Sequence, residues 1–274
     1  MEVAVVGHVE WVEFVRVEHV PRAGEIVHSL ERWEEAAGGG AVAAVQLAKL
    51  NGGVHFFTAL GDDELGRRSR EQLEGQGVTV HSAVRDEPQR RAFTHVDGDG
   101  ERTITVIGQK LLPSGESGDL PWELLGRCDA VFFVSGDVSA LRAARRARVL
   151  VATARELATL RRAAEQVDVV VGSGEDPGER FEPGELEPPP RTLVTTSGAL
   201  GGWIRPGGPF RAAPLPGPVE DAYGCGDCFA AGLTFGLAQQ RSMEEAVALA
   251  ARCGAAVLTG RGAYGAQLDA AALD

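Results

Sequence analysis

The segment 221–232 constrains this chain more than any other, because two glycines flank a single cysteine and an aspartate follows directly. Gly224 and Gly226 allow the backbone to turn tightly and to expose several N–H groups. The small, apolar residues 228–238 predict a helix packed into a core. A glycine turn leading into a helix start forms an anion site, because the free N–H groups and the positive end of the helix dipole point the same way. Asp227 beside it predicts phosphoryl transfer, with the carboxylate accepting a proton from the attacking hydroxyl. The alternative is a turn that only begins a core helix.

The same segment resembles the carboxy-terminal signature of the PfkB/ribokinase family of sugar kinases. The resemblance implies that Asp227 is the catalytic base and that an anion hole forms at Gly224, Cys225 and Gly226. It also implies ATP as the phosphoryl donor and Mg²⁺ as the ion that neutralises the polyphosphate. A helix N-terminus favours the thiolate, whereas the charge of Asp227 opposes it, and on balance we expect Cys225 to react with alkylating reagents.

A second glycine run, at Gly38, Gly39 and Gly40, resembles the amino-terminal signature of the same family. Glycines let the backbone approach a ligand closely, and the following residues 41–50 predict a helix. The resemblance implies that this run contacts the acceptor, together with Val42, which stands where the family usually has a sugar-binding Asn. The alternative is a helix-start turn packed against the sheet.

Two acidic residues follow the first predicted strand, where the family commonly offers Asn and Asp to sugar hydroxyls. Glu10 and Glu13 are therefore candidate substrate ligands, since carboxylates accept hydrogen bonds from hydroxyls or hold a cationic group. Their charge would repel a sugar phosphate, which predicts an uncharged or amine-bearing acceptor. The alternative is a solvated lid strand with scattered charges.

The family's Asn-x-x-Glu element, which helps to organise Mg²⁺ and phosphate, has a partial counterpart after the predicted strand 167–171. Ser173 and Asp176 keep the spacing of this element but not its residue types. A carboxylate oxygen suits Mg²⁺, so Asp176 is a candidate ligand, and Glu175 is a rival. A polar loop without a metal is the alternative.

Two further glycine-rich segments resemble the family's nucleotide-binding loops. The first, at a predicted strand end, gives the candidates Thr196, Ser197, Gly198 and Gly201. The second gives Gly260 and Gly262, in a loop that in the family borders the adenine and a monovalent-cation site. The aspartate that opens the carboxy-terminal motif serves this cation in the family, which implies K⁺ beside Asp221.

Short apolar runs predict buried strands of a parallel sheet at 3–6, 54–60, 130–134, 149–151, 167–171 and 192–195. Helical segments between several of them are typical of βαβ units. Alternating patterns predict half-exposed strands at 9–17, 91–96 and 103–107, the last two joined by a hairpin turn. With the resemblance, the chain is expected to be one α/β domain, residues 1–274, with a three-layer α/β/α ribokinase-like fold. A mostly parallel central sheet would carry a small β-strand lid within about 9–33 and 85–107.

The net charge of −12 argues against a nucleic-acid partner or an anionic membrane surface. No apolar run is long enough to span a bilayer, and the first residues are typical of a strand, so we expect a cytoplasmic protein. Neither lysine, Lys49 or Lys110, follows a glycine-rich loop, which disfavours a Walker-type ATPase. No Gly-x-Gly-x-x-Gly follows the first strand, which disfavours a Rossmann dehydrogenase.

Residues and resemblance together predict an ATP-dependent kinase that transfers the γ-phosphoryl group to a hydroxyl of a small carbohydrate, with Asp227 as general base. A nucleoside kinase of the same fold is one alternative. A non-catalytic sensor that binds a sugar or a nucleotide is another alternative. It is favoured because Val42 and Ser173 stand where the family has residues that bind the sugar and organise Mg²⁺. The family also implies a homodimer through the exposed lid strands.

Overall fold

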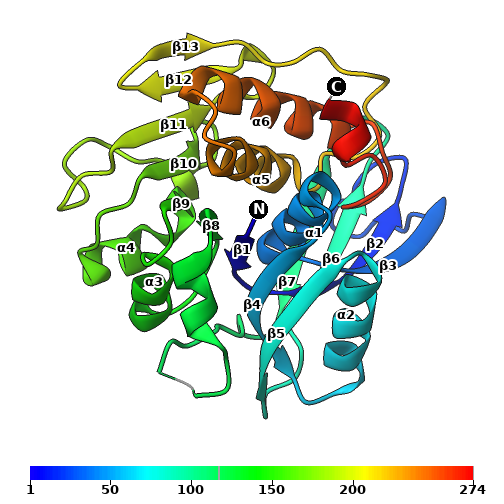
Figure 1. The fold of residues 1–274 in the computed structure, drawn as a ribbon. Coiled ribbons are helices and arrows are strands. Elements are labelled where there is room, and N and C mark those ends of the chain that lie inside the picture. The colour runs from blue at the N-terminus through cyan, green and yellow to red at the C-terminus, as the bar shows by residue number, and fades with distance from the viewer. Residues whose placement is uncertain (117, 274) are drawn as a thin grey trace.

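The computed structural model describes residues 1–116 and 118–273, which form two β-sheets and the helices around them (Figure 1). The larger sheet has nine strands in the order β13-β12-β11-β10-β9-β8-β1-β4-β5. These strands are β1 (Val3–Val6), β4 (Val54–Gly61), β5 (Val78–Arg85), β8 (Ala130–Phe133), β9 (Val149–Thr153), β10 (Val169–Ser173), β11 (Thr192–Thr196), β12 (Gly202–Arg205) and β13 (Gly208–Phe210). The helices are α1 (Gly39–Asn51), α2 (Glu64–Gly75), α3 (Val138–Ala144), α4 (Leu157–Ala163), α5 (Cys225–Ala238) and α6 (Met243–Val257).

Seven neighbouring strands of the large sheet, from β11 to β5, run parallel, and only the edge strands β12 and β13 are antiparallel. β1 and β8 are buried along their whole length, as expected for strands covered by helices on both faces. The carboxyl ends of the parallel strands meet at one edge of the sheet. In open α/β sheets, ligands bind beyond this edge.

The helices form one layer on each face of the large sheet (Figure 1). α1, α5 and α6 pack on one face, in a core that includes Leu47, Leu233 and Leu249. α3 and α4 pack on the other face, in a second core that includes Leu141 and Leu160. The predicted three-layer α/β/α arrangement is therefore confirmed.

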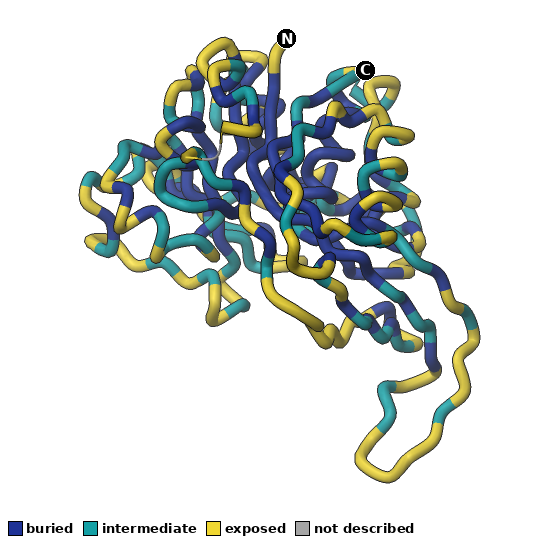
Figure 2. The backbone as a smooth tube through the Cα atoms, turned by 90° about the horizontal axis from the view of Figure 1, so that it is seen from below, coloured by how far each residue is buried: buried dark blue, intermediate teal, exposed yellow. Residues whose placement is uncertain are grey.

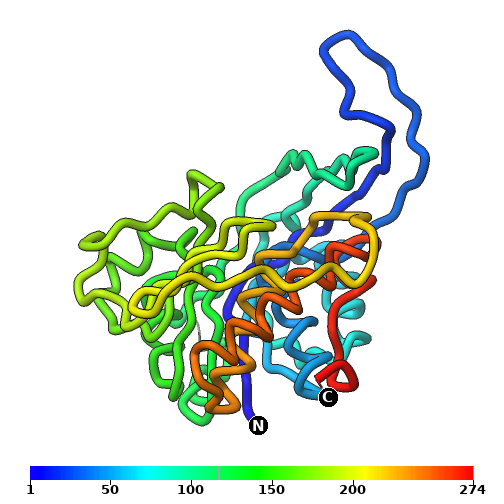
Figure 3. Tube along the Cα trace, turned by 90° about the horizontal axis from the view of Figure 1, so that it is seen from above, coloured from blue at the N-terminus to red at the C-terminus, as the bar shows by residue number. Residues whose placement is uncertain are grey.

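The smaller sheet has four strands in the order β3-β2-β6-β7 and forms the lid. They are β2 (Glu10–Arg16), β3 (Glu31–Ala37), β6 (Arg91–Val96) and β7 (Arg102–Ile107). The connection between β2 and β3 projects from the body of the molecule as a long loop, blue in Figure 3 and mostly exposed in Figure 2. The predicted mostly parallel sheet with a separate β lid is confirmed.

The prediction of a half-exposed strand at 9–17 is wrong for its first half. Glu10, Val12 and Phe14 are buried, because this face of β2 packs on the body of the protein, where the ring of Phe14 lies 5.0 Å from that of Tyr223. On the opposite face, the guanidinium of Arg68 from α2 covers Trp11 at 4.3 Å from the ring centroid. Both faces of the strand are therefore covered in its first half, and Glu13 and Val15 are half-buried.

The lid is attached to the segment that leads into α5. The N–H of Ala222 donates to the carbonyl of Gly100, in the β6–β7 turn, at 3.0 Å. Arg16 of β2 donates to the carbonyl of Glu220 at 3.3 Å. These bonds place the lid next to the predicted anion hole. Among the helices of the described residues, none is both long enough and apolar enough to cross a membrane.

Candidate active site

The start of α5 adopts the turn that the sequence predicts at the anion hole. Gly224 has a φ of +77°, in the left-handed region, and it caps the helix that begins at Cys225. A Cβ on Gly224 would lie 2.8 Å from the Cγ1 of Val42, so this position also requires glycine for close packing. The first N–H groups of a helix have no partner within it, so this end of α5 offers donors to an anion.

Asp227 lies in the first turn of α5 with its carboxylate against the backbone of α1. A Cβ on Gly39 would lie 2.8 Å from the Oδ1 of Asp227, so glycine leaves the room that this carboxylate occupies. Within residues 1–116 and 118–273, no ion pair or hydrogen bond engages the carboxylate. Desolvation and the charge of Glu179 raise the pKa of Asp227 to about 7. A carboxylate with this pKa is suited to take up and release a proton near neutral pH.

The backbone of the run Gly38–Gly40 lies between Asp227 and the lid strand β2. The N–H of Gly38 donates to the hydroxyl of Tyr223 at 3.1 Å, and a Cβ on Gly38 would lie 3.1 Å from the Cγ of Glu10. A Cβ on Gly40 would lie 2.6 Å from a backbone oxygen of the β1–β2 connection. Close approach from both sides explains the glycines, and it brings Glu10 and Asp227 against the same short segment.

The two candidate acidic ligands of β2 lie in different places. Glu10 is 7% exposed, and its carboxylate lies 2.8 Å from Nε of Arg90 and 3.7 Å from Nε2 of His8. Burial raises the pKa of Glu10, and the charge of Arg90 opposes this shift. Glu13 instead pairs with Arg32 of β3 at 2.9 Å, at the half-exposed side of the strand. The structure therefore brings only Glu10 next to the glycine run.

Val42 is fully buried and packs under Gly224. Its side chain supports the anion-hole turn from behind, whereas the Asn of related sequences was expected to face the sugar. Gln267 donates to the carbonyl of Val42 at 3.1 Å, which fixes this part of α1 to the carboxy-terminal segment. A direct substrate contact by the Val42 side chain has no support from this packing.

The loop after β10 gathers carboxylates that are largely occupied by one arginine. Arg155 binds Asp176 at 2.5 Å and Glu179 at 2.6 Å. The Oγ of Ser173 accepts from the N–H groups of Glu175 and Asp176, each at 3.2 Å, so it stabilises the loop itself. The N–H of Gly178 and the guanidinium of Arg155 lower the pKa of Asp176.

Glu179 is a site residue that the sequence did not single out. Its charge is the strongest electrostatic influence that raises the pKa of Asp227, and its second oxygen accepts from the N–H of Ser173 at 3.1 Å. It lies three residues beyond Asp176, in a segment rich in Pro, Gly and Glu. Several acidic residues of this segment look alike in the sequence, and only the folded loop shows which of them faces Asp227.

The candidate nucleotide residues lie in two loops at the same edge of the sheet. Thr196 ends β11, and Ser197, Gly198 and Gly201 form the turn before β12. The carboxylate of Glu175 lies beside Gly198, where a Cβ would meet its Oε1 at 3.2 Å. Gly260 and Gly262 follow α6, alongside the segment that leads to the anion hole, since Glu220 donates to the carbonyl of Leu258 at 2.8 Å.

Asp221 is fully buried and connects the two segments. Its Oδ1 accepts from the N–H of Tyr223 at 2.9 Å, and its Oδ2 accepts from the N–H of Gly262 at 3.1 Å. A second carboxylate, Glu35, accepts from the N–H of Ala263 at 2.9 Å. Burial raises the pKa of both carboxyls.

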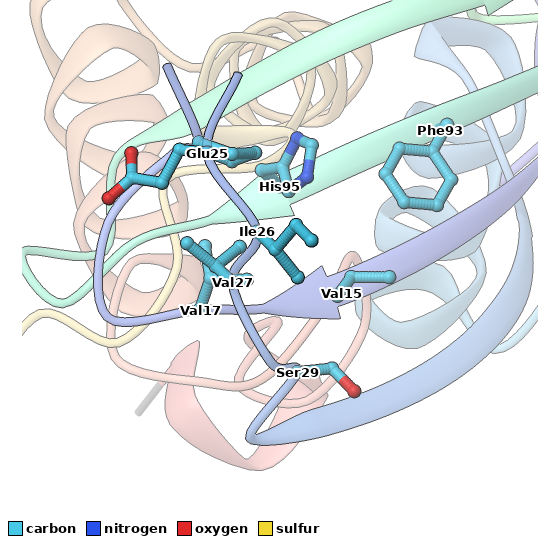
Figure 4. Close-up of a pocket in the computed structure, with 9 residues that line it drawn as sticks. Val15, Val17, Glu25, Ile26, Val27, Ser29, Phe93 and His95 are labelled. Carbon is cyan, nitrogen blue, oxygen red and sulfur yellow. The ribbon is translucent and has the colours of Figure 1, made fainter. Parts of the chain in front are cut away.

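Two cavities lie away from Asp227. One, of about 410 Å³, lies between the outer face of the lid and the β2–β3 loop, with Val15, Ile26 and Phe93 in its wall (Figure 4). The other, of about 600 Å³, lies between the β12–β13 hairpin and the start of α6, with Phe210 and Met243 in its wall. Neither is lined by a residue of the predicted catalytic segments.

Three features together define the class of α/β small-molecule kinases: a glycine turn at a helix start, a carboxylate beside it that has no partner among the described residues, and a β lid at the carboxyl edge of a parallel sheet. The family model described as pfkB family carbohydrate kinase matches residues 1–176 and 135–270. The chain therefore belongs to the pfkB family of carbohydrate kinases.

Individual relatives agree with this family. A ribokinase of Dictyostelium discoideum is 30% identical over 108 residues, which are 39% of this chain and 34% of that protein, so the match spans about a third of the curated relative. The structure of Arabidopsis thaliana ribokinase complexed with ribose and ATP has a TM-score of 0.78 at 21% identity and covers 99% of this chain and 97% of that chain. A microbiome-derived acarbose kinase has a TM-score of 0.81 at 22% identity, with 99% and 97% covered. These structures show the ribokinase-like fold.

Proposed function

We propose that this protein is an ATP-dependent kinase that transfers the γ-phosphoryl group to a hydroxyl of a small carbohydrate. The observation that carries the proposal is Asp227, a carboxylate without a cationic partner among the described residues, at the N-terminus of α5 and with a pKa raised to about 7. The Arabidopsis relative with ribose and ATP supports the choice of donor and acceptor class.

In the proposed reaction, an acceptor hydroxyl lies between Asp227 and the γ-phosphorus. The acceptor oxygen forms a bond to phosphorus while the bond from phosphorus to the β–γ bridging oxygen breaks, so ADP leaves. Asp227 takes the hydroxyl proton and later releases it to solvent. The N–H groups at Gly224, Cys225 and Gly226 would bind the oxygens of the transferred group, where negative charge is spread in the transition state.

The loop after β10 is the proposed place for Mg²⁺. Magnesium commonly uses one or two carboxylates together with phosphates and water, so a complete protein cage is not needed. Indeed, no group of three or more His, Cys, Asp or Glu in the described residues is arranged as one. Asp176 and Glu175 are the carboxylates that would hold the ion, whereas Ser173 already accepts two backbone N–H groups. The ion would neutralise the charge of the polyphosphate.

For the predicted K⁺, the carboxylates of Asp221, which is fully buried, and Glu35, which is half-buried, would suit a cation. Partial or complete loss of contact with water disfavours the ionised form of each carboxyl, and a monovalent cation beside them would offset this cost. Gly260 and Gly262 would border the adenine next to it. Thr196, Ser197, Gly198 and Gly201 would line the other side of the nucleotide.

Glu10 is the proposed ligand for the acceptor hydroxyls. Glu10 is already paired with Arg90, so its charge repels an anionic acceptor less than the charge of an isolated carboxylate would. Glu13 points to the opposite face of the strand, where it pairs with Arg32, and would not contact the acceptor. A neutral sugar remains the first choice, because a carboxylate beside an arginine offers both acceptors and donors to neighbouring hydroxyls. A nucleoside is the alternative acceptor.

A coupled assay of ADP release over neutral sugars, sugar phosphates and nucleosides tests the proposal. We expect a neutral sugar to give the highest kcat/KM, and Asp227→Asn to lower its turnover by about a hundredfold or more. A nucleoside as best acceptor would select the alternative kinase. Tight binding of a sugar or ATP without ADP release by the wild type would select the sensor.

We also propose a homodimer through the lid, where apolar side chains are exposed on the β2–β3 loop, Ile26 at 87% and Leu30 at 63%, and on the edge strand β7, Val106 at 45%. Light scattering should give a mass near twice that of the chain. A mass of one chain at micromolar concentration would contradict the dimer.

A further inference from the structure

Two histidines lie side by side on neighbouring strands of the large sheet. His55 is the second residue of β4, and His81 lies in β5 opposite Phe57, so the two histidines are diagonal neighbours on one face of the sheet. Nδ1 of His55 lies 3.1 Å from Nε2 of His81. Because His55 lies at the amino end of β4, the pair is remote from Asp227, which lies at the carboxyl edge of the sheet.

Neighbouring side chains hold both imidazole rings. The ring centroid of His81 lies 4.8 Å from that of Phe57, which is fully buried and stacks on Trp122. Nε2 of His55 lies 3.2 Å from Oε2 of Glu2, the residue before β1. A carboxylate beside one ring nitrogen favours the proton there and leaves the other nitrogen, here Nδ1, free to bind a metal. Both histidines are half-buried, so an ion can reach them from solvent.

We propose that His55 and His81 bind one divalent transition-metal ion between Nδ1 of the first ring and Nε2 of the second. An imidazole nitrogen lies about 2.0–2.1 Å from a bound Zn²⁺. Two such nitrogens are therefore about 2.9 Å apart at a right angle and about 3.3 Å apart at the tetrahedral angle. The 3.1 Å between the two nitrogens lies within this range, so one ion fits both after a slight rotation of the rings. The ion would replace the hydrogen bond that joins these nitrogens in the metal-free protein.

The chemistry of the pair selects the kind of ion. Imidazole nitrogens suit Zn²⁺, Ni²⁺ and Cu²⁺, whereas Mg²⁺ prefers oxygen ligands. Two protein ligands leave the other coordination positions to water, which is consistent with the absence of a metal cluster of three such residues in the described part of the chain. The charge of Arg70 acts on His81 and opposes a cation, and the carboxylate of Glu2 beside His55 offsets this effect.

Calorimetry with Ni²⁺ alone, in a buffer that does not bind metals, tests the site. The wild type should bind the ion, and His55→Ala and His81→Ala should not bind it at concentrations that saturate the wild type. Glu2→Gln should weaken binding about tenfold, because it removes the carboxylate that orients His55. His19→Gln is the matched control, since His19 has a carboxylate partner, Glu25 at 2.8 Å, but no hydrogen bond to a second imidazole among the described residues. Equal affinity of the wild type and both alanine variants, or no binding by the wild type, would overturn the proposal.

A spectroscopic measurement on the wild type needs no variant, so it holds even if a substitution disturbs folding. Electron paramagnetic resonance with one equivalent of Cu²⁺, on protein labelled with nitrogen-15 at histidine, should show two imidazole nitrogens bound to the copper. His19→Gln should give the same spectrum. Two nitrogens would support the site, whereas one nitrogen, or none, would overturn it. Neither result bears on phosphoryl transfer, because the ion would lie away from the sheet edge that carries Asp227.

Discussion

The start of α5 and the loop after β10 both present carboxylates at the carboxyl edge of the sheet, yet their environments are opposite. Asp227 has no cationic partner among the described residues, and burial with a neighbouring negative charge raises its pKa to about 7. Asp176 accepts from a backbone N–H and binds Arg155 at 2.5 Å, which lowers its pKa. Groups of one type whose pKa values are pushed apart are suited to different tasks. One can exchange protons near neutral pH, and the other stays negative.

Exchanging each carboxylate for its amide tests this comparison with the largest effect. Asp227→Asn should lower kcat by about a hundredfold or more, because the proton acceptor is lost, while ADP affinity stays within about threefold. Asp176→Asn is the matched control and should alter mainly the KM for Mg-ATP. Turnover by Asp227→Asn within a few-fold of the wild type would remove the distinction between the two regions.

Arg155 connects the regions, so its removal should make them more alike. The charge of Arg155 lowers the pKa of Asp227, and Arg155→Gln should therefore raise that pKa further above its ordinary value. Since the base must be deprotonated, activity at pH 7 should fall about threefold and recover at higher pH. Steady-state kinetics between pH 6 and 9 measure this shift. A rate loss that is equal at every pH would show that Arg155 acts on the loop and not on Asp227.

Cys225 gives the smallest expected effect. Although its position at a helix N-terminus predicts a reactive thiolate, burial raises the pKa of the thiol, and Asp227 adds to this shift. Only the backbone of this residue would serve the anion hole, so Cys225→Ala should keep kcat within about twofold. Iodoacetamide at pH 7 should label Cys225 slowly, as peptide mapping can measure. Rapid inactivation by iodoacetamide that Mg-ATP slows would instead support a reactive thiolate at Cys225.

The parallel core could be predicted from the sequence because its strands are continuous apolar runs. The run before Gly7 becomes β1, and residues 130–134 include β8, each between two layers of helices. The edge strand β5 and the strand β12, which is next to the other edge, were not predicted. β5 alternates between buried and exposed residues, and β12 is short and adjoins a Gly-Pro-rich hairpin. Such strands are defined by their neighbours in the sheet.

In the candidate active site too, local features could be predicted from the sequence, whereas contacts between distant residues could not. The turn at Gly224 and the helix after it follow from local sequence, since glycine and small apolar residues determine them. The partners of Glu10 and Asp176 do not, because Arg90 and Arg155 are 80 and 21 residues away from these acids. Pairs between residues so far apart in the sequence form only in the tertiary structure. For the same reason, the sequence could not show that Asp227 has no partner among the described residues.

The central claim is that Asp227 is a carboxyl group whose proton exchanges near neutral pH. Carbon-13 NMR of protein labelled at the aspartate carboxyl carbons can follow this group in the free enzyme, with Asp227→Asn identifying its resonance by loss. We predict a titration midpoint near pH 7 for Asp227 and a midpoint below the ordinary aspartate range for Asp176. A midpoint near 4 for Asp227 would contradict the claim.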